Sequence, residues 1–293
     1  MDNGWLDSGA ILAEWWWLVG AALGLCVGSF LNVVVHRYPR MFERDMRREA
    51  SEILAGEPSA TPAPDGYTLA LPRSACPACG HGISAMENLP VVSWLWLRGR
   101  CAGCGTAISP RYPLVEATTA LMTLVVLWAV GVNAAGFAAV LLTWWLIPLA
   151  LIDADTYYLP DAMTLPLLWL GLLLNTQSVL VDLESAVWGA IAGYLSLWSV
   201  FQLFKLLTGK EGMGFGDFKL LAALGAWLGW QSLPTIVILS SFVGAAVGLA
   251  LIAFAGRDRA RPIPFGPYLA AAGWLTLVWG EDIRRFYFGI LGS

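Results

Sequence analysis

The sequence is poor in charged residues: Asp, Glu, Lys and Arg make up only 13% of its 293 residues, whereas 58% are hydrophobic. A typical soluble domain has about 25% charged residues. A water-soluble globular fold has no means of covering so much apolar surface, so this class of protein is excluded. The composition indicates that the chain lies in a lipid bilayer.

Histidine is nearly absent, with only His36 and His81 in the whole chain. Neither belongs to an HExxH motif, and two histidines placed in this way cannot support a Ser-His-Asp triad. The sequence also lacks a Gly-rich fingerprint for nucleotide binding. Because of the histidines, serine hydrolysis and zinc-protease chemistry are disfavoured. No nucleic-acid partner is expected for this chain.

Eight apolar runs approach the ~20 residues that a helix needs to cross a hydrocarbon core of about 30 Å. The runs occupy residues 15–35, 113–132, 136–152, 162–181, 184–207, 218–231, 233–255 and 265–280. The sixth run is short, so we expect it to be tilted or partly re-entrant. The first lacks the basic segment and cleavage site of a signal peptide, so we expect it to remain as an anchor. The predicted fold class is an all-α polytopic membrane protein with about eight transmembrane helices.

The distribution of Lys and Arg predicts the orientation. Nine arginines lie between Arg37 and Arg111, and eight spans place this loop on one side with six further cations, so that fifteen of the seventeen share one face. That face is predicted to be cytoplasmic, with both termini on the outer side. Three parts follow: residues 1–35 as the N-terminal segment and first helix, 36–112 as a cytoplasmic insert, and 113–293 as a seven-helix membrane domain. The insert opens with an Arg/Glu-rich stretch, RMFERDMRREASEIL, typical of a surface helix.

Four of the five cysteines form two CxxC pairs inside the insert, Cys76 with Cys79 and Cys101 with Cys104. Each pair is followed by Gly, and 21 residues separate the pairs, a spacing typical of four thiolates that bind one zinc ion. A pair of disulfides is the alternative, but a reducing compartment disfavours it. Four cysteines form a closed, structural site, so zinc is not expected to activate water, and His81 is not expected to be a ligand.

Acidic residues stand at the ends of two predicted spans. Asp153, Asp155 and Asp161 lie in LIDADTYYLPD after the third span, and Asp217 closes GMGFGD before the sixth. The topology brings both groups to the cytoplasmic ends of their helices. Two carboxylates in a low-dielectric site do not both ionise readily, so one stays protonated while the other takes a proton from attacking water. This is the chemistry of aspartyl proteases. Gly214 and Gly216 are expected to allow close approach of a substrate strand and backbone conformations barred to other residues.

Other interpretations of these carboxylates stay open at this stage. Asp161 precedes an apolar run and is also a candidate helix N-cap. An acidic pair in a polytopic protein also suits a proton or cation transporter, which predicts ion flux and no peptide product. A membrane scaffold is a further alternative and predicts that Asp153 and Asp217 both tolerate Asn.

The chain resembles the bacterial type IV prepilin peptidases, which serve type IV pilus assembly and type II secretion. The resemblance rests on ordered motifs along nearly the whole chain: GSFLNVVVHRYP, the two CxxC pairs, NLPVVSWLWLRGRC, SPRYPLVE, LIDADTYYLPD, GMGFGDFKLLAALGAWLGW and PFGPYLA. It implies that Asp153 and Asp217 are the catalytic aspartates, the second in the GxGD motif of intramembrane aspartyl proteases. Asp155 and Asp161 then become supporting residues.

The resemblance also implies substrates, a second activity and a location. Such enzymes cleave cationic leaders of prepilins and pseudopilins after a Gly, at the cytoplasmic face of the bacterial inner membrane. They then methylate the new N-terminal residue with S-adenosylmethionine, and Gly99 occupies the position that the family ties to methyltransfer. Lys219 either lowers the cost of an ionised aspartate or marks the cytoplasmic boundary. The sequence carries no indication of an oligomeric state.

Overall fold

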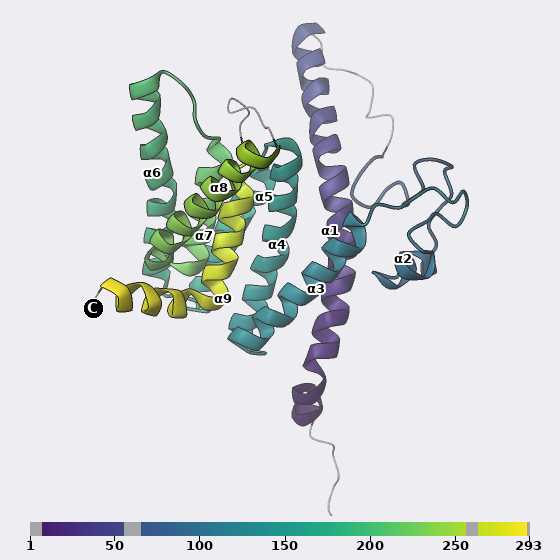
Figure 1. Ribbon diagram of the computed structural model, residues 1–293, viewed down its shortest axis with the longest axis horizontal. Coiled ribbons are helices and arrows are strands. Elements are labelled where there is room, and N and C mark those ends of the chain that lie inside the picture. The colour runs from purple at the N-terminus through teal and green to yellow at the C-terminus, as the bar shows by residue number, and fades with distance from the viewer. Residues whose placement is uncertain (1–7, 56–65, 256–262, 292–293) are drawn as a thin grey trace, which may run out of the picture. The chain divides into compact units, whose positions relative to one another are not determined.

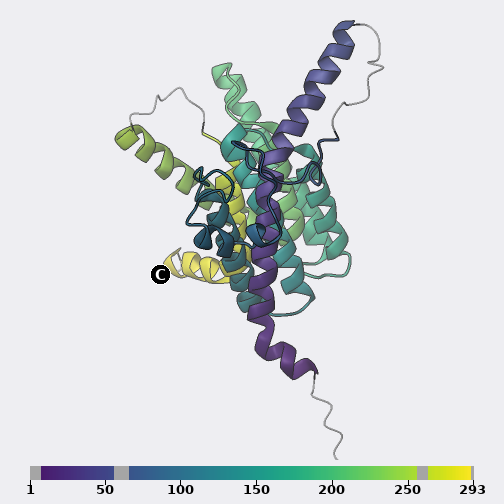
Figure 2. The same ribbon diagram turned by 90° about the vertical axis from the view of Figure 1, so that its right-hand side faces the viewer.

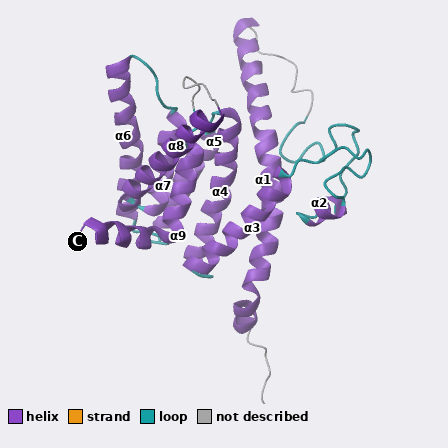
Figure 3. Cartoon of the chain, in the orientation of Figure 1, coloured by secondary structure: helices purple, strands orange, loops and turns teal. Residues whose placement is uncertain are grey.

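The computed structural model describes residues 8–55, 66–255 and 263–291, and this part of the chain contains helices, turns and loops but no strand (Figure 3). Its α-helices are α1 (Ser8–Ala55), α2 (Val92–Trp96), α3 (Arg111–Val130), α4 (Ala134–Thr156), α5 (Asp161–Asn175), α6 (Leu183–Thr208), α7 (Phe215–Leu228), α8 (Leu233–Ala255) and α9 (Gly266–Leu291). The all-α prediction is confirmed for these residues.

Five stretches of the described helices are long and apolar enough to cross a membrane: Trp15–Leu54, Arg111–Val130, Ala134–Thr156, Leu183–Thr208 and Trp230–Phe254. The runs predicted at 162–181 and 218–231 coincide with α5 and α7, which have 15 and 14 residues. Helices of this length measure about 21–23 Å, less than a hydrocarbon core. Helix α9, on the run at 265–280, is interrupted at Trp279 (φ −126°, ψ 19°). The multi-pass prediction is confirmed, but the count of eight spans is not.

The chain divides into two compact units, Met1–Leu124 and Val125–Ser293. In the first, α1 and α3 pack closely at two glycines spaced four residues apart. A Cβ on Gly24 would lie 2.5 Å from the Cα of Ala120, and one on Gly28 would lie 2.7 Å from the Cα of Glu116. Small residues at this spacing allow the backbones of membrane helices to approach each other, which is a main source of packing energy in lipid.

Helix α1 continues for several turns beyond its apolar part, as predicted for the Arg/Glu-rich stretch. Arg37 is buried in this region and donates hydrogen bonds to the carbonyl oxygens of Thr68, at 2.9 Å, and Pro72, at 2.7 Å. The segment that follows Gly66 is therefore tied to the helix by a buried guanidinium group, which gives this part of the insert a structural role.

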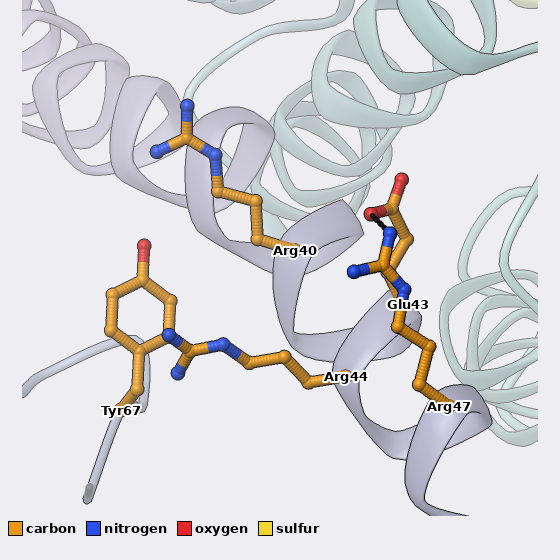
Figure 4. Close-up of a pocket in the computed structure, with 5 residues that line it drawn as sticks. All are labelled: Arg40, Glu43, Arg44, Arg47 and Tyr67. Carbon is orange, nitrogen blue, oxygen red and sulfur yellow. Dashed lines mark ion pairs between the residues drawn. The ribbon is translucent and has the colours of Figure 1, made fainter.

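A charged pocket of about 270 Å³ lies beside the same stretch of α1 (Figure 4). The guanidinium of Arg44 lies 4.6 Å from the ring centre of Tyr67, a cation–π contact, and Arg47 pairs with Glu43 at 3.5 Å. These exposed contacts add little stability individually. Of these contacts, the one between Arg44 and Tyr67 joins the returning chain to α1, as Arg37 does.

In the second unit, α7 is almost entirely enclosed by protein. It packs against α5, α6 and α9 (Figures 1 and 2), and nearly every residue from Asp217 to Leu228 is buried. The closest approach is to α6, where a Cβ on Gly189 would lie 2.2 Å from the carbonyl oxygen of Gly225. This burial explains why a helix too short to cross a membrane is nevertheless apolar from Leu220 to Leu228.

Candidate active site

Asp153 lies in the last turn of α4 and is 4% exposed. One carboxylate oxygen, Oδ2, accepts a hydrogen bond of 2.9 Å from the backbone N–H of Gly266 at the start of α9. The helix ends at Thr156 and is capped by Tyr157, which has a left-handed backbone (φ 57°) and donates its N–H to the carbonyl oxygen of Asp153. The carboxylate is therefore held at a helix end, in contact with a second helix.

Asp217 lies in the first turn of α7 and is 7% exposed. Its N–H donates to the carbonyl oxygen of Gly214 at 3.3 Å, and its carboxylate interacts electrostatically with that of Asp153. The structure therefore brings together the two acidic residues that the sequence analysis paired across 64 positions. Both lie within the second compact unit.

The glycines before Asp217 differ from the prediction. Gly214 has φ −81° and Gly216 is not among the positive-φ glycines, so the expected need for a conformation barred to other residues is wrong. Gly216 is required instead by packing, since a Cβ there would lie 2.6 Å from the Cβ of Leu159. A Cβ on Gly214 would meet only the Asp217 carboxylate, at 3.8 Å, which is ordinary contact.

The supporting residues occupy different places. Asp161 is the first residue of α5, whose N-cap is Pro160, so the N-cap interpretation of Asp161 is wrong. Both of its carboxylate oxygens lie 2.6 Å from the Nζ of Lys219 on α7. Lys219 therefore joins the starts of α5 and α7 and does not merely mark a boundary. Asp155 is exposed near the end of α4.

Two residues of this region were not predicted as site residues. Gly266 belongs to the PFGPYLA motif, but nothing in the sequence gave it a role. Leu159, 5% exposed, lies between the positions that side chains on Gly216 and Gly266 would occupy. The roles of Gly266 and Leu159 depend on contacts between segments that are distant in the sequence. The only indication in the sequence was that glycine stands within a motif.

The four predicted cysteines form one cluster in the first unit. Their Sγ atoms all lie within 4.8 Å of one another, with 3.8 Å between Cys76 and Cys104 and 4.0 Å between Cys79 and Cys101. These distances are too long for disulfides, whose bond is about 2.05 Å. A tetrahedral zinc ion with bonds of about 2.3 Å has S···S edges of about 3.8 Å. The cluster therefore fits a single zinc ion.

The two CxxC segments have the same local structure. In the first, Gly80 has φ 72° and donates to the carbonyl oxygen of Cys76 at 2.9 Å; in the second, Gly105 has φ 73° and donates to that of Cys101 at 2.9 Å. The glycine after each pair thus supplies the left-handed turn that directs two thiols to one point. The cluster is built from two copies of one knuckle.

His81 does not belong to this cluster. Its Nε2 lies 3.1 Å from Oε1 of Glu87. Hydrogen bonds from the Ser84 backbone and hydroxyl, and then from His81, hold the pKa of Glu87 at about 2. The imidazole is therefore oriented by a carboxylate, and that His81 is not a zinc ligand stays a prediction.

Gly99 lies between α2 and Cys101 and has a left-handed backbone, with φ 68°. A Cβ there would lie 2.9 Å from Cζ2 of Trp94, whose indole N–H donates to the carbonyl oxygen of Ile108 at 3.2 Å. The N–H of Ile108 in turn donates to the carbonyl oxygen of Gly99 at 2.7 Å. Gly99 is therefore required both by its backbone and by the position of the Trp94 ring.

Fold and site together define a multi-pass helical membrane protein with a buried pair of carboxylates and a cysteine cluster. Residues 22–130 match the bacterial peptidase A24 N-terminal domain, and residues 140–249 match the type IV leader peptidase family. A relative from Aeromonas salmonicida (strain A449), named prepilin leader peptidase/N-methyltransferase, is 56% identical over 266 residues, which cover 90% of each chain. This chain therefore belongs to the type IV leader peptidase family.

Further relatives carry the same name. One from Pseudomonas aeruginosa is 56% identical over 270 residues, 92% of each chain, and one from Dichelobacter nodosus is 50% identical over 266 residues, 90% of this chain and 91% of the relative. No solved structure matches the chain. The family resemblance is confirmed, and nothing in these comparisons supports the transporter alternative.

Proposed function

We propose that this protein is an intramembrane aspartic peptidase that removes the cationic leader of type IV prepilins and type II secretion pseudopilins, and that it then methylates the new N-terminus. The observation that carries the peptidase proposal is a pair of buried carboxylates in one compact unit, Asp153 and Asp217, each next to a glycine that packs closely against Leu159. Membership of the type IV leader peptidase family supports the same assignment.

Asp153 and Asp217 share one proton in the proposed mechanism. The ionised carboxylate takes a proton from water as the water attacks the scissile carbonyl, and the protonated one donates to the carbonyl oxygen. Gly266 donates a hydrogen bond to Asp153, and Leu159 packs beside Gly216 and Gly266. The ion pair between Asp161 and Lys219 joins α5 to α7. Asp155 is exposed two residues from Asp153, and we assign it at most a minor supporting role.

The location follows from charge and from substrate chemistry. We assign the chain to the bacterial cytoplasmic membrane, with the insert and the carboxylates on the cytoplasmic side, as the distribution of Lys and Arg predicts. A cationic leader then stays in the cytoplasm near the carboxylates, while the apolar helix that follows it partitions into lipid. The scissile bond after Gly is thereby held at the membrane surface.

The cysteine cluster is assigned to one structural zinc ion held by Cys76, Cys79, Cys101 and Cys104. Zinc supplies a tetrahedral crosslink there and no open coordination position. We propose a division into an N-terminal segment with the first membrane helix (1–35), a zinc-binding insert (36–112) and a membrane peptidase domain (113–293).

The methylation proposal rests on the name that these relatives carry, prepilin leader peptidase/N-methyltransferase. S-adenosylmethionine is the proposed methyl donor, and it supplies an electrophilic methyl group to the free α-amine. Gly99 supports this activity through the fold of the insert, since it fixes Trp94.

A single incubation tests the proposed function. Purified full-length protein in lipid nanodiscs is mixed with a prepilin and S-adenosylmethionine, and the products are identified by mass spectrometry. We expect one cut after the leader Gly and one added methyl group on the new N-terminal residue. An intact prepilin under these conditions contradicts the peptidase proposal, and a cut but unmethylated product contradicts the methyltransferase proposal alone.

Gly99→Ala is expected to lower methylation while leaving cleavage intact. The change strains a left-handed backbone, at a cost of about 1 kcal/mol or more, and displaces the Trp94 ring. Methylation of a pilin that already has a free N-terminus is compared with cleavage of a prepilin by the same preparation. Gly82→Ala is the matched control, because a Cβ there meets nothing within 4 Å. Equal loss of both activities in Gly99→Ala contradicts a specific role.

A further inference from the structure

The first turn of α9 has one backbone N–H that is not used within the helix. The N–H groups of Tyr268 and Leu269 both donate to the carbonyl oxygen of Phe265, at 3.1 Å, and Pro267 has no N–H. The remaining N–H, on Gly266, donates to Oδ2 of Asp153 at 2.9 Å. A helix N-terminus carries a partial positive charge, so this arrangement favours a carboxylate at that point.

Gly266 also has no space for a side chain. A Cβ there would lie 2.6 Å from Oδ2 and 3.1 Å from Cγ of Asp153, and 3.0 Å from Cδ1 of Leu159. Gly266 is not among the positive-φ glycines, so its backbone conformation does not demand glycine. The demand comes from the carboxylate, which would have to leave its position to admit a methyl group.

The same packing reaches the second carboxylate. Leu159 lies between Gly266 and Gly216, since a Cβ on Gly216 would be 2.6 Å from the Cβ of Leu159. Gly216 directly precedes Asp217 in the first turn of α7. One leucine therefore separates the two close backbone approaches, one beside each aspartate.

We propose that Gly266 is a positioning residue for leader cleavage: its N–H fixes the Asp153 carboxylate, and its missing side chain keeps the space that this carboxylate occupies. The proposal rests on the proposed peptidase function of Asp153 and Asp217. Because Gly266 acts through Asp153, its replacement affects the chemical step and not the affinity for prepilin.

The first test compares two glycines of α9. Gly266→Ala is expected to lower kcat for cleavage by about 100-fold, since a shift of about 1 Å in a catalytic group has an effect of this size, with KM unchanged. Gly273→Ala is the matched control: its Cβ would also meet a side chain at 2.6 Å, but that side chain is Leu224. It is expected to retain wild-type kcat. Methylation of a pre-cleaved pilin by each variant shows that the chain is folded.

A second measurement needs no replacement of Gly266. Labelling with carbonyl-13C Phe and 15N Gly selects the Phe-Gly pairs at residues 216, 266 and 289. The Gly266 amide resonance is expected to move strongly in Asp153→Asn, because the carboxyl acceptor of its hydrogen bond is replaced by an amide, while the Gly289 resonance stays in place. An unmoved Gly266 resonance overturns the proposal even if Gly266→Ala does not fold.

The outcomes separate this inference from the proposed function. If Asp153→Asn still cleaves prepilin, the catalytic role of Asp153 is wrong and the inference falls with it. If Asp153→Asn is inactive but Gly266→Ala keeps wild-type kcat, only the positioning role is overturned. Equal losses in Gly266→Ala and Gly273→Ala, or a rise in KM without a fall in kcat, also overturn it.

Discussion

Asp153→Asn and Asp217→Asn are each expected to lower kcat for leader cleavage by about 10³-fold or more, because each removes an ionisable group from a mechanism that needs two. Asn has nearly the shape of Asp, so the packing around these buried positions is kept. The measurement is cleavage of a prepilin by the purified full-length variants, followed by mass spectrometry of the product. The double variant is expected to be no worse than either single one, since the pair acts as a unit.

Asp155→Asn is the matched control for this experiment. It makes the same chemical change two residues from Asp153, at an exposed position of the same helix, so we expect at most a small loss of cleavage. Methylation of a pre-cleaved pilin should persist in all three variants and reports that they are folded. Near-normal cleavage by Asp153→Asn or by Asp217→Asn removes that residue from catalysis.

The residues of the site could be predicted because their chemistry conflicts with their surroundings. A carboxylate at the end of an apolar run is costly, so Asp153 and Asp217 stood out, and a threaded topology brought them to one side of the membrane. The cysteine cluster was equally readable, because two CxxC pairs followed by glycine have few alternative structures. In each case the local pattern and the tertiary contact agree.

The span count could not be predicted in the same way. Hydropathy measures whether a side chain avoids water, and it does not distinguish a helix that faces lipid from one enclosed by other helices. Helix α7 is apolar because protein surrounds it, as the close approach of Gly189 and Gly225 illustrates. Its 14 residues therefore looked like a short membrane span.

The contacts that hold the two carboxylates could not be predicted from the sequence either. The bond from Gly266 to Asp153 joins residues 113 positions apart, and no periodicity or composition predicts such a pairing. Gly216 was predicted to be glycine for two reasons, close approach of a substrate strand and backbone freedom. The actual reason is its contact with Leu159, which only a three-dimensional arrangement reveals.

Cys76→Ser and Cys104→Ser are each expected to release the zinc ion and unfold the insert between residues 66 and 110. Only Gly99 is buried within that range, so the segment has almost no apolar core of its own. Structural zinc contributes about 10–16 kcal/mol of apparent binding free energy in small peptides at pH 7. This is as large as the whole stability of a typical domain, about 5–15 kcal/mol. Zinc content and hydrogen exchange of residues 66–110 measure the two effects.

His81→Gln is the matched control, because it changes a potential ligand beside the first knuckle without removing a thiolate. The His81 ring bonds to Glu87, so we expect the variant to keep its zinc and the slow exchange of the insert. Cysteine thiols must lose their protons to bind zinc. Acid should therefore promote the release of zinc from the wild type as well. Full zinc content in Cys76→Ser contradicts the assignment of four thiolates. Loss of zinc in His81→Gln also contradicts it and indicates that the imidazole is a ligand.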